Sequence, residues 1–110
     1  MNKEDYLYIL DLIPTGSDDP VPLGELAYFT GLEERAVKRL IQQLRLDGHP
    51  VISHPKGGYF IPDLDNEEDM QIARRFVAAM KAQAYSRIKV AENLADSLAD
   101  LELTQVSFDE

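Results

Sequence analysis

The first half of the chain carries three runs in which apolar residues recur every three or four positions, the spacing of an amphipathic helix. The first run ends before Pro14 and contains Tyr6, Leu7, Ile9, Leu10, Leu12 and Ile13. The second run begins at Leu23 and is stopped by Gly31, and the third ends at Gly48, a predicted left-handed cap. Proline and glycine at these places terminate helices. The pattern therefore predicts three short helices.

Two short β-prone runs follow the third helix. Residues 51–53 (Val-Ile-Ser) and 59–61 (Tyr-Phe-Ile) are separated by the five-residue loop His-Pro-Lys-Gly-Gly. A loop of this length and composition between β-prone runs predicts a hairpin. Earlier in the chain, residues 14–20 combine turn formers with acids and predict a surface loop, with a short extended piece at residues 21–23.

The last third of the chain predicts one long helix. From Asp65, a candidate N-cap, a helical pattern without proline or glycine continues to about Leu103, and a frayed tail is expected beyond it. Such a helix would be roughly 55–60 Å long at 1.5 Å per residue. That is longer than a small domain is wide, so we expect this helix to protrude, to break into two or to pair with another.

The apolar positions of the predicted long helix fit a heptad repeat. One column contains Met70, Val77, Ala84, Ala91 and Leu98, and the other contains Ala73, Met80, Leu94 and Leu101, interrupted by Arg87. The alanines allow close packing but bury little area. The heptad predicts homodimerisation through Val77, Met80, Ala84, Ala91, Leu94, Leu98 and Leu101.

Together these elements predict a mostly α-helical protein with a small β-hairpin, of the α+β class. The 110 residues are enough for one compact domain with an appendage. We place the domain at residues 1–62 and the long acidic helix with its short tail at residues 63–110.

Composition removes several classes of function. With no cysteine and two histidines, the chain predicts no disulfide and no metal site. It shows no Gly-rich phosphate loop, no catalytic triad in a sensible context and no EF-hand spacing, so we expect neither an enzyme nor a cofactor. No leader and no apolar run of about 20 residues is present, which predicts a cytoplasmic protein that does not enter a membrane.

The net charge of −9 argues against indiscriminate binding of nucleic acid, because such binding depends on Lys and Arg. The charge is unevenly distributed. Residues 1–62 hold six basic and nine acidic side chains, whereas residues 63–110 hold five and eleven. The first part is therefore nearly balanced and can carry a local basic face.

The spacing of small residues between the second and third helices is the most informative motif. Ala27 is followed by Gly31 four positions later and by Val37 six positions after that. The alanine lets two helices approach, the glycine takes the positive φ of a tight turn, and Leu26, Leu32, Val37 and Leu40 fill the angle between the helices. Residues 23–43 resemble the helix-turn-helix of bacterial regulators. With the hairpin at residues 51–61 as a wing, residues 5–62 resemble the winged helix-turn-helix domains of the biotin-repressor and DeoR-like group.

This resemblance implies that the third helix lies in the major groove of DNA. The implied DNA-binding residues are Arg35, Lys38, Arg39, Gln42, Lys56 and His54. Arginine suits guanine, glutamine suits adenine, and lysine suits phosphate. Glu33 and Glu34 stand where the family usually has Ser or Thr; they favour the helix dipole but repel phosphate.

The resulting hypothesis is a sequence-specific, bacterial or phage-type protein that binds double-stranded DNA as a homodimer, in transcription regulation or replication initiation. A winged-helix module that binds another protein instead of DNA is the alternative, since the basic residues also fit an ordinary solvated helix face. A third hypothesis has the acidic helix mimic DNA or cover the basic face.

Overall fold

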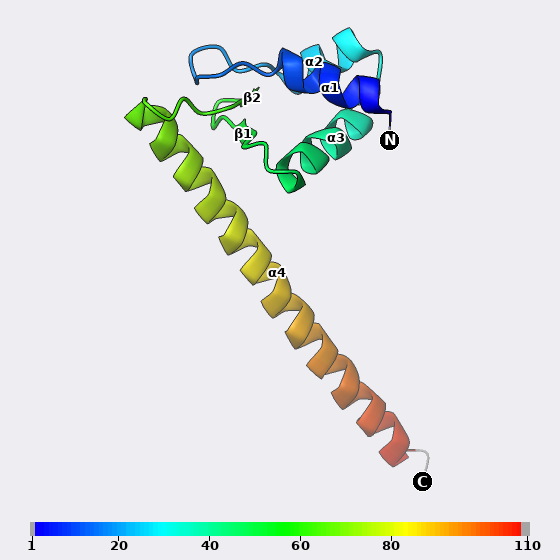
Figure 1. Ribbon diagram of the computed structural model, residues 1–110. Helices are drawn as coiled ribbons and strands as arrows, with labels where there is room; N and C mark the ends of the chain where they lie inside the picture. Colours follow the sequence, from blue (N-terminus) through cyan, green and yellow to red (C-terminus); the bar gives the residue numbers. More distant parts are fainter. Residues whose placement is uncertain (1, 109–110) are drawn as a thin grey trace. The chain divides into compact units, whose positions relative to one another are not determined.

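The computed structural model describes the backbone of residues 2–108 and the side chains of residues 2–104. Its elements in chain order are α1 (Lys3–Leu12), α2 (Leu23–Thr30), α3 (Glu34–Leu46), β1 (Ile52–Ser53), β2 (Tyr59–Phe60) and α4 (Glu67–Phe108) (Figure 1). A mostly helical chain with one antiparallel hairpin agrees with the predicted α+β class. Residues up to Phe76 form one compact unit, and the rest of α4, from Val77, forms a second.

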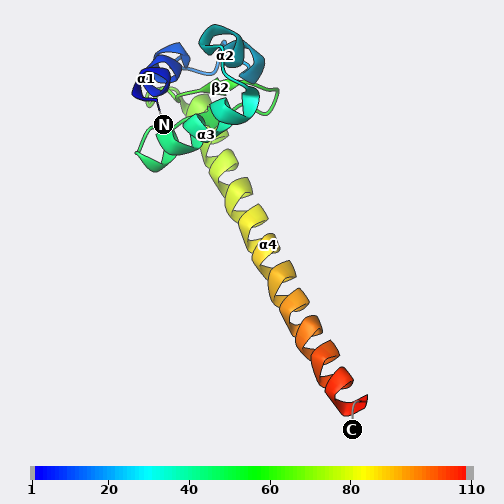
Figure 2. The same cartoon turned by 90° about the vertical axis from the view of Figure 1, so that its right-hand side faces the viewer.

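Helices α1, α2 and α3 pack on one another around the main core of the first unit (Figure 2). Each contributes its apolar stripe, as the periodicity predicted: Ile9 from α1, Leu26 from α2 and Val37 from α3 are completely buried. The other buried members of this cluster are Ile13, Val21, Leu40, Ile41, Leu44 and Val51. Burying such side chains supplies about 1.5–3 kcal/mol each, which is why the stripes determine how the helices meet.

The turn between α2 and α3 has the predicted geometry. Gly31 lies at φ 72°, and its N–H donates to the Ala27 carbonyl at 2.9 Å. Just beyond the end of α3, Gly48 lies at φ 98°, and the amide of His49 donates to the Leu44 carbonyl at 2.9 Å. This last bond closes a Schellman motif and satisfies a carbonyl that the helix end would leave without a partner.

The hairpin pairs Ile52 with Phe60 and Ser53 with Tyr59. The loop after α1 extends this small sheet: Val21 forms an antiparallel bridge to Tyr59, and Thr15 a parallel bridge to Ile61. Phe60 is completely buried and Tyr59 is half-buried, so the ring of Phe60 packs in the core. The predicted surface loop therefore also anchors the hairpin.

The first residues of α4, Glu67–Phe76, belong to the first compact unit. Ala73 joins Ile52 and Phe60 in a second buried cluster, with Ile72 and Phe76 packed against it. The predicted domain boundary after residue 62 lies before α4, whereas the compact unit includes this first part of the helix. The first residues of α4 thus pack in the core of the first unit, and the same helix continues without interruption as the second unit.

Both predicted ends of the long helix need correction. The N-cap is Asn66 and not Asp65, because the Asn66 Oδ1 accepts the Asp69 amide at 3.2 Å while the Asp65 amide is itself bound by the Asp63 carboxylate at 3.0 Å. The helix also continues past Leu103 to Phe108. No proline or glycine occurs in residues 63–110, so nothing in the local sequence ends it earlier.

Candidate functional site

Four of the six predicted DNA-binding residues lie on the outer face of α3. Arg35, Lys38, Arg39 and Gln42 are all exposed and follow the i, i+3, i+4, i+7 spacing of one helix face. The opposite face is the buried stripe of the core. Among the described residues, none of the four side chains forms a hydrogen bond or an ion pair, so this face is available to a ligand.

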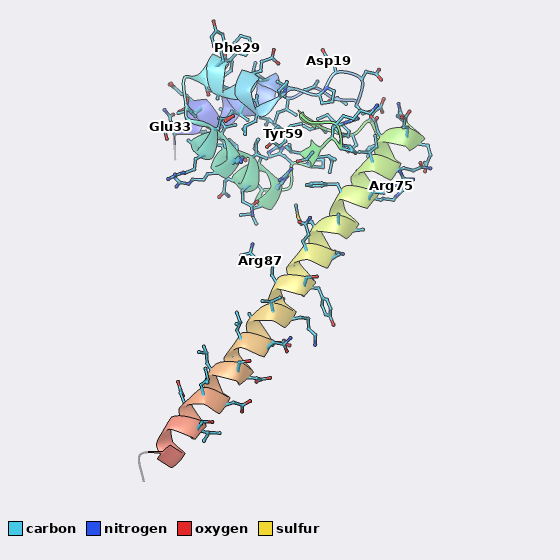
Figure 3. The ribbon with its side chains drawn as sticks, turned by 180° about the vertical axis from the view of Figure 1, so that it is seen from behind. Asp19, Phe29, Glu33, Tyr59, Arg75 and Arg87 are labelled. Carbon is cyan, nitrogen blue, oxygen red and sulfur yellow. The ribbon has the colours of Figure 1, made fainter. Side chains whose placement is uncertain are left out.

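Two carboxylates stand at the start of this helix. Glu33 is the N-cap residue and makes no side-chain cap bond, and Glu34 lies in the first turn (Figure 3). Both are exposed. The basic face therefore begins beside negative charge, which lowers its attraction for phosphate at this end.

Lys56 and His54, the other two predicted DNA-binding residues, lie in the loop of the hairpin. The Lys56 side chain is exposed. The partly buried His54 has a structural contact: its Nδ1 accepts the Lys56 amide at 3.1 Å, and its ring meets Phe60 edge-on with the centroids 5.9 Å apart. Lys56 can thus meet a ligand directly, whereas His54 shapes the loop that presents it.

Gly58 is required where the hairpin meets the loop after α1. Its φ is +92°, and a Cβ atom at this position would lie 2.8 Å from the Pro20 Cβ and 3.0 Å from the Pro20 carbonyl carbon. The neighbouring Gly57 also has a positive φ, +105°, but has open space around it. The two glycines that predicted a turn therefore differ, because only Gly58 allows a close approach of two backbones.

Arg45 has a structural role that sequence reasoning missed. Its Nε donates to the Val51 carbonyl at 2.7 Å, one of its terminal nitrogens lies 3.2 Å from the Ser53 Oγ, and its guanidinium stacks 5.0 Å from the centre of the Phe76 ring. Burial lowers the pKa of Arg45. This cation joins α3, the hairpin and α4, and it is not part of the exposed basic face. Periodicity could not reveal this, because Arg45 lies on the same helix as the exposed cations.

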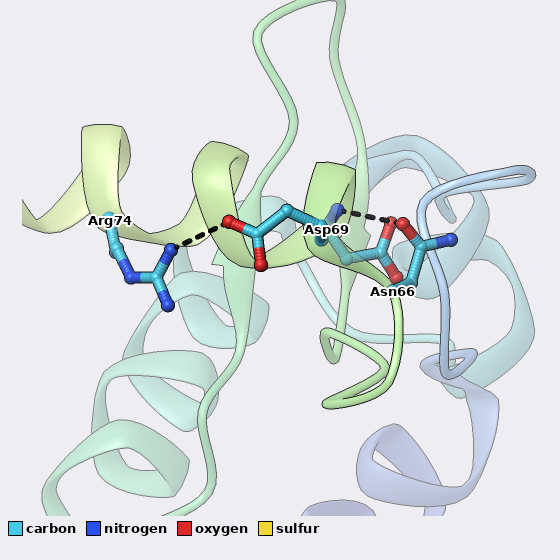
Figure 4. Close-up of polar contacts among 4 residues, drawn as sticks. Asn66, Asp69 and Arg74 are labelled. Carbon is cyan, nitrogen blue, oxygen red and sulfur yellow. Dashed lines mark hydrogen bonds and ion pairs between the residues drawn. The ribbon is translucent and has the colours of Figure 1, made fainter.

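Asp69 is the second missed residue and the only charged side chain that is completely buried among the described residues. Its carboxylate accepts the hydroxyl and the amide of Ser17, the amide at 3.3 Å, and the Asp63 amide at 3.0 Å. The bond from the Ser17 hydroxyl is the main reason that the pKa of Asp69 is lowered. Figure 4 shows Asp69 beside Asn66, together with the exposed ion pair that Arg74 forms with Glu67. Asp69 thus holds the loop after α1 against the start of α4.

A third polar contact joins α1 to the end of α3. The Tyr6 hydroxyl donates to Asp47 at 2.6 Å, and the Gln43 amide donates to the other carboxylate oxygen at 2.9 Å. The hydrogen bond from Tyr6 is the main reason that the pKa of Asp47 is lowered, and the same bond raises the pKa of Tyr6. The acidic charge nearest the end of α3 is therefore engaged within the protein.

The seven predicted dimerisation residues are exposed on the second unit. Val77 and Met80 expose 44% and 45% of their surface, and Leu94, Leu98 and Leu101 expose 59–63%. Ala84 and Ala91 are exposed between them. Because residues at heptad spacing share one helix face, these side chains form an apolar stripe that is interrupted at Arg87 and that we call the α4 stripe.

No group of His, Cys, Asp and Glu within the described residues is arranged to hold a metal ion. Within the same residues, no helix is apolar over enough of its length to cross a bilayer. Comparison with known proteins gives no match to this chain among family models, curated proteins or solved structures.

Proposed function

We propose that this protein is a sequence-specific DNA-binding protein of bacterial or phage type, in which residues 1–62 act as a winged helix-turn-helix domain. The observation that carries the proposal is the exposed face of α3 with Arg35, Lys38, Arg39 and Gln42, none of which is engaged within the described protein. The turn at Gly31 and the hairpin directly after α3 support it, since both are features of the winged-helix arrangement. Transcription regulation or replication initiation in the cytoplasm is the proposed role.

Each side chain of the α3 face has a role that follows from its chemistry. Arg35 and Arg39 would each donate two hydrogen bonds to a guanine edge, and Gln42 would bind adenine. Lys38 and Lys56 would neutralise phosphates and set the register of the helix in the groove. His54 would act through the loop that it shapes.

A homodimer formed through the α4 stripe would compensate for the small number of cations. One protomer offers four exposed cations at the proposed interface, Arg35, Lys38, Arg39 and Lys56. If all four met phosphates, affinity would fall roughly 100-fold between 50 and 200 mM salt, so a single domain would bind weakly under physiological conditions. Two domains on two half-sites multiply their affinities.

Titration of fluorescent duplex DNA tests the DNA-binding proposal. Anisotropy measured against a pool of random duplexes at 50 and 200 mM salt should show binding with a steep salt dependence. The double variant Arg35→Ala/Arg39→Ala should lose binding. Arg74→Ala/Arg75→Ala removes the same charge from exposed positions outside the α3 face and should bind as the wild type does. Absence of wild-type binding at 50 mM salt, or equal losses in both variants, refutes the proposal.

Sedimentation equilibrium tests the dimer. The full chain should sediment at twice its mass of 12.4 kDa. Leu94→Glu/Leu98→Glu places carboxylates in the α4 stripe and should give a monomer, whereas Tyr85→Glu, away from the stripe, should leave the dimer intact. A monomeric wild type at 100 μM contradicts this part of the proposal.

The alternative function is a module that binds another protein. It is favoured by the net charge of −9 and by an exposed aromatic pair on α2, where Tyr28 exposes 81% and Phe29 49% of its surface and the rings meet edge-on at 5.5 Å. Exposed aromatic side chains are typical of protein interfaces. Under this alternative the wild type would not bind DNA at 50 mM salt.

A further inference from the structure

Charges along α4 are separated by sign. Beyond Asp69, every charged residue up to position 89 is basic, and every charged residue from position 92 to the end of the chain is acidic. The basic residues are Arg74, Arg75, Lys81, Arg87 and Lys89, and the acidic residues with described side chains are Glu92, Asp96, Asp100 and Glu102. A helix dipole favours the reverse order, with acids toward the N-terminus and bases toward the C-terminus. The stability of the isolated helix therefore does not account for this separation.

Most of these charges have no partner of opposite sign within the described part of the chain. Lys89 and Glu92 form an ion pair at 3.8 Å, at the point where the sign changes. On either side of that point, Lys81, Arg87, Asp96, Asp100 and Glu102 form no ion pair within the described residues. Figure 3 shows Arg87 extending from the helix. These charges are exposed and available to another molecule.

Of the separated charges, Lys81 and Glu102 lie directly beside the α4 stripe, one position after Met80 and Leu101, and Arg87 lies within it. Ile88, which exposes 56% of its surface, lies next to the position where Arg87 interrupts the stripe. The face that carries the apolar seam therefore also carries the basic Lys81 and Arg87 in its first half and the acidic Glu102 in its second half. Such a surface fits a partner with the same seam and the opposite order of charges.

We propose that the partner of the α4 stripe is the same helix of a second copy, running antiparallel; this rests on the homodimer proposed above. A parallel pair in register would place Lys81, Arg87 and Glu102 each at the level of the same residue of the second copy, which is unfavourable for like charges. An antiparallel pair brings each basic half against the acidic half of the other copy.

The heptad positions define a register for this pair. Centring the two-fold axis between residues 92 and 93 places Ala84 opposite Leu101 and Ala91 opposite Leu94 of the second copy. At these two pairs small residues face large ones, which favours a close approach of the helices. The same register places Arg87 opposite Leu98 of the second copy. In the same register Lys81 flanks the seam at the level of Glu102 of the second copy. The two small-to-large pairs and the contact between Lys81 and Glu102 thus agree on the antiparallel orientation.

Distances between spin labels test the orientation. The chain has no cysteine, so Ala78→Cys and Asn93→Cys each give one label per copy. Both sites lie off the stripe on an exposed part of α4. In the antiparallel pair, labels at position 78 should be about 44 Å apart along the axis and those at position 93 within about 20 Å. Distances below about 20 Å at both positions overturn the antiparallel orientation but agree with the proposed homodimer. Absence of dipolar coupling together with monomeric sedimentation overturns the dimer itself.

Charge reversal gives a second measurement on the full chain. Lys81→Glu and Glu102→Lys should each raise the dimer dissociation constant about fivefold or more at 50 mM salt, because each creates two like-charge contacts in the symmetric pair. The double variant Lys81→Glu/Glu102→Lys should have a dimer dissociation constant within about twofold of that of the wild type. The control double variant Lys89→Glu/Glu102→Lys has the same net charge as this double variant, and its dissociation constant should stay raised. In a parallel pair these two positions are about 30 Å apart, so failure of the first combination to rescue overturns the proposal.

Discussion

Replacing each of the two adjacent glycines of the hairpin loop by alanine separates backbone strain from steric overlap. Gly57 and Gly58 both have positive φ, +105° and +92°, so alanine is strained at either position. Only at position 58 does the added methyl group meet other atoms, at 2.8 Å from the Pro20 Cβ and at 3.0 and 3.1 Å from the Pro20 carbonyl carbon and oxygen. The two variants therefore differ by one close contact.

The magnitudes follow from these geometries. A non-glycine residue in such a conformation costs about 1–3 kcal/mol of unfolding free energy, which is the effect expected for Gly57→Ala. Gly58→Ala adds the cost of overpacking, about another 1–3 kcal/mol, because backbone atoms cannot rotate away as the end of a flexible side chain can. Gly58→Ala should thus lose about 2–6 kcal/mol, a large part of the stability of a small domain.

Urea unfolding followed by tyrosine fluorescence measures this difference. With a slope of about 1 kcal/mol per molar urea, the midpoint of Gly58→Ala should lie at least about 1 M below that of Gly57→Ala. Equal midpoints for the two variants would refute the argument that the approach of Pro20 requires glycine at position 58.

Three further predictions concern contacts within the first compact unit. Asp69→Ala removes the acceptor of the partly buried bonds from Ser17 and the Asp63 amide and should cost about 3 kcal/mol in urea unfolding at pH 7. Because the pKa of Asp69 is lowered in the folded protein, its contribution is complete above about pH 4, the ordinary range of a carboxyl, and is lost as the pH falls through the lowered value. The variant should therefore lose less stability than the wild type between pH 5 and pH 2, and equal losses would contradict this. Arg45→Lys should lower the thermal midpoint by several degrees, since lysine cannot reproduce the stacking on Phe76 together with the bonds to the hairpin; an unchanged midpoint would show that these contacts add no stability. Asn66→Ala removes the N-cap of α4 and should cost about 1 kcal/mol by chemical denaturation, whereas Asp65→Ala, at the cap position predicted from the sequence, should cost less.

In the first unit, the hydrophobic period of the sequence predicted most features of the helices. The stripes of α1, α2 and α3 and the turns at Gly31 and Gly48 were predicted, because each depends on residues close together in the chain. The exposed face of α3 followed from the same periodicity, since residues on the side opposite a buried stripe face solvent. The N-cap of α4 was placed one residue early, because Asp65 and Asn66 are both good caps and only the bond to Asp69 distinguishes them.

The sequence did not distinguish charged side chains with structural contacts from exposed side chains of the same charge. Asp69 stands in a run of acids that all look like helix capping, yet it alone is buried, because the loop after α1 brings Ser17 over it. Arg45 follows Arg35, Lys38 and Arg39 along α3, yet it turns inward to the hairpin and Phe76. Nothing local separates these residues from their neighbours.

What the sequence alone determined, then, is the set of elements and the face that each one buries or exposes, because hydrophobic period, caps and turns act over a few residues. Tertiary structure decided which polar groups are engaged: the Ser17 loop on Asp69, the approach of Pro20 to Gly58, and Arg45 on the hairpin. These contacts join residues distant in the chain, and their partners are defined only once the helices have packed. The physical reason is that burial of a polar group depends on what covers it, which no local pattern encodes.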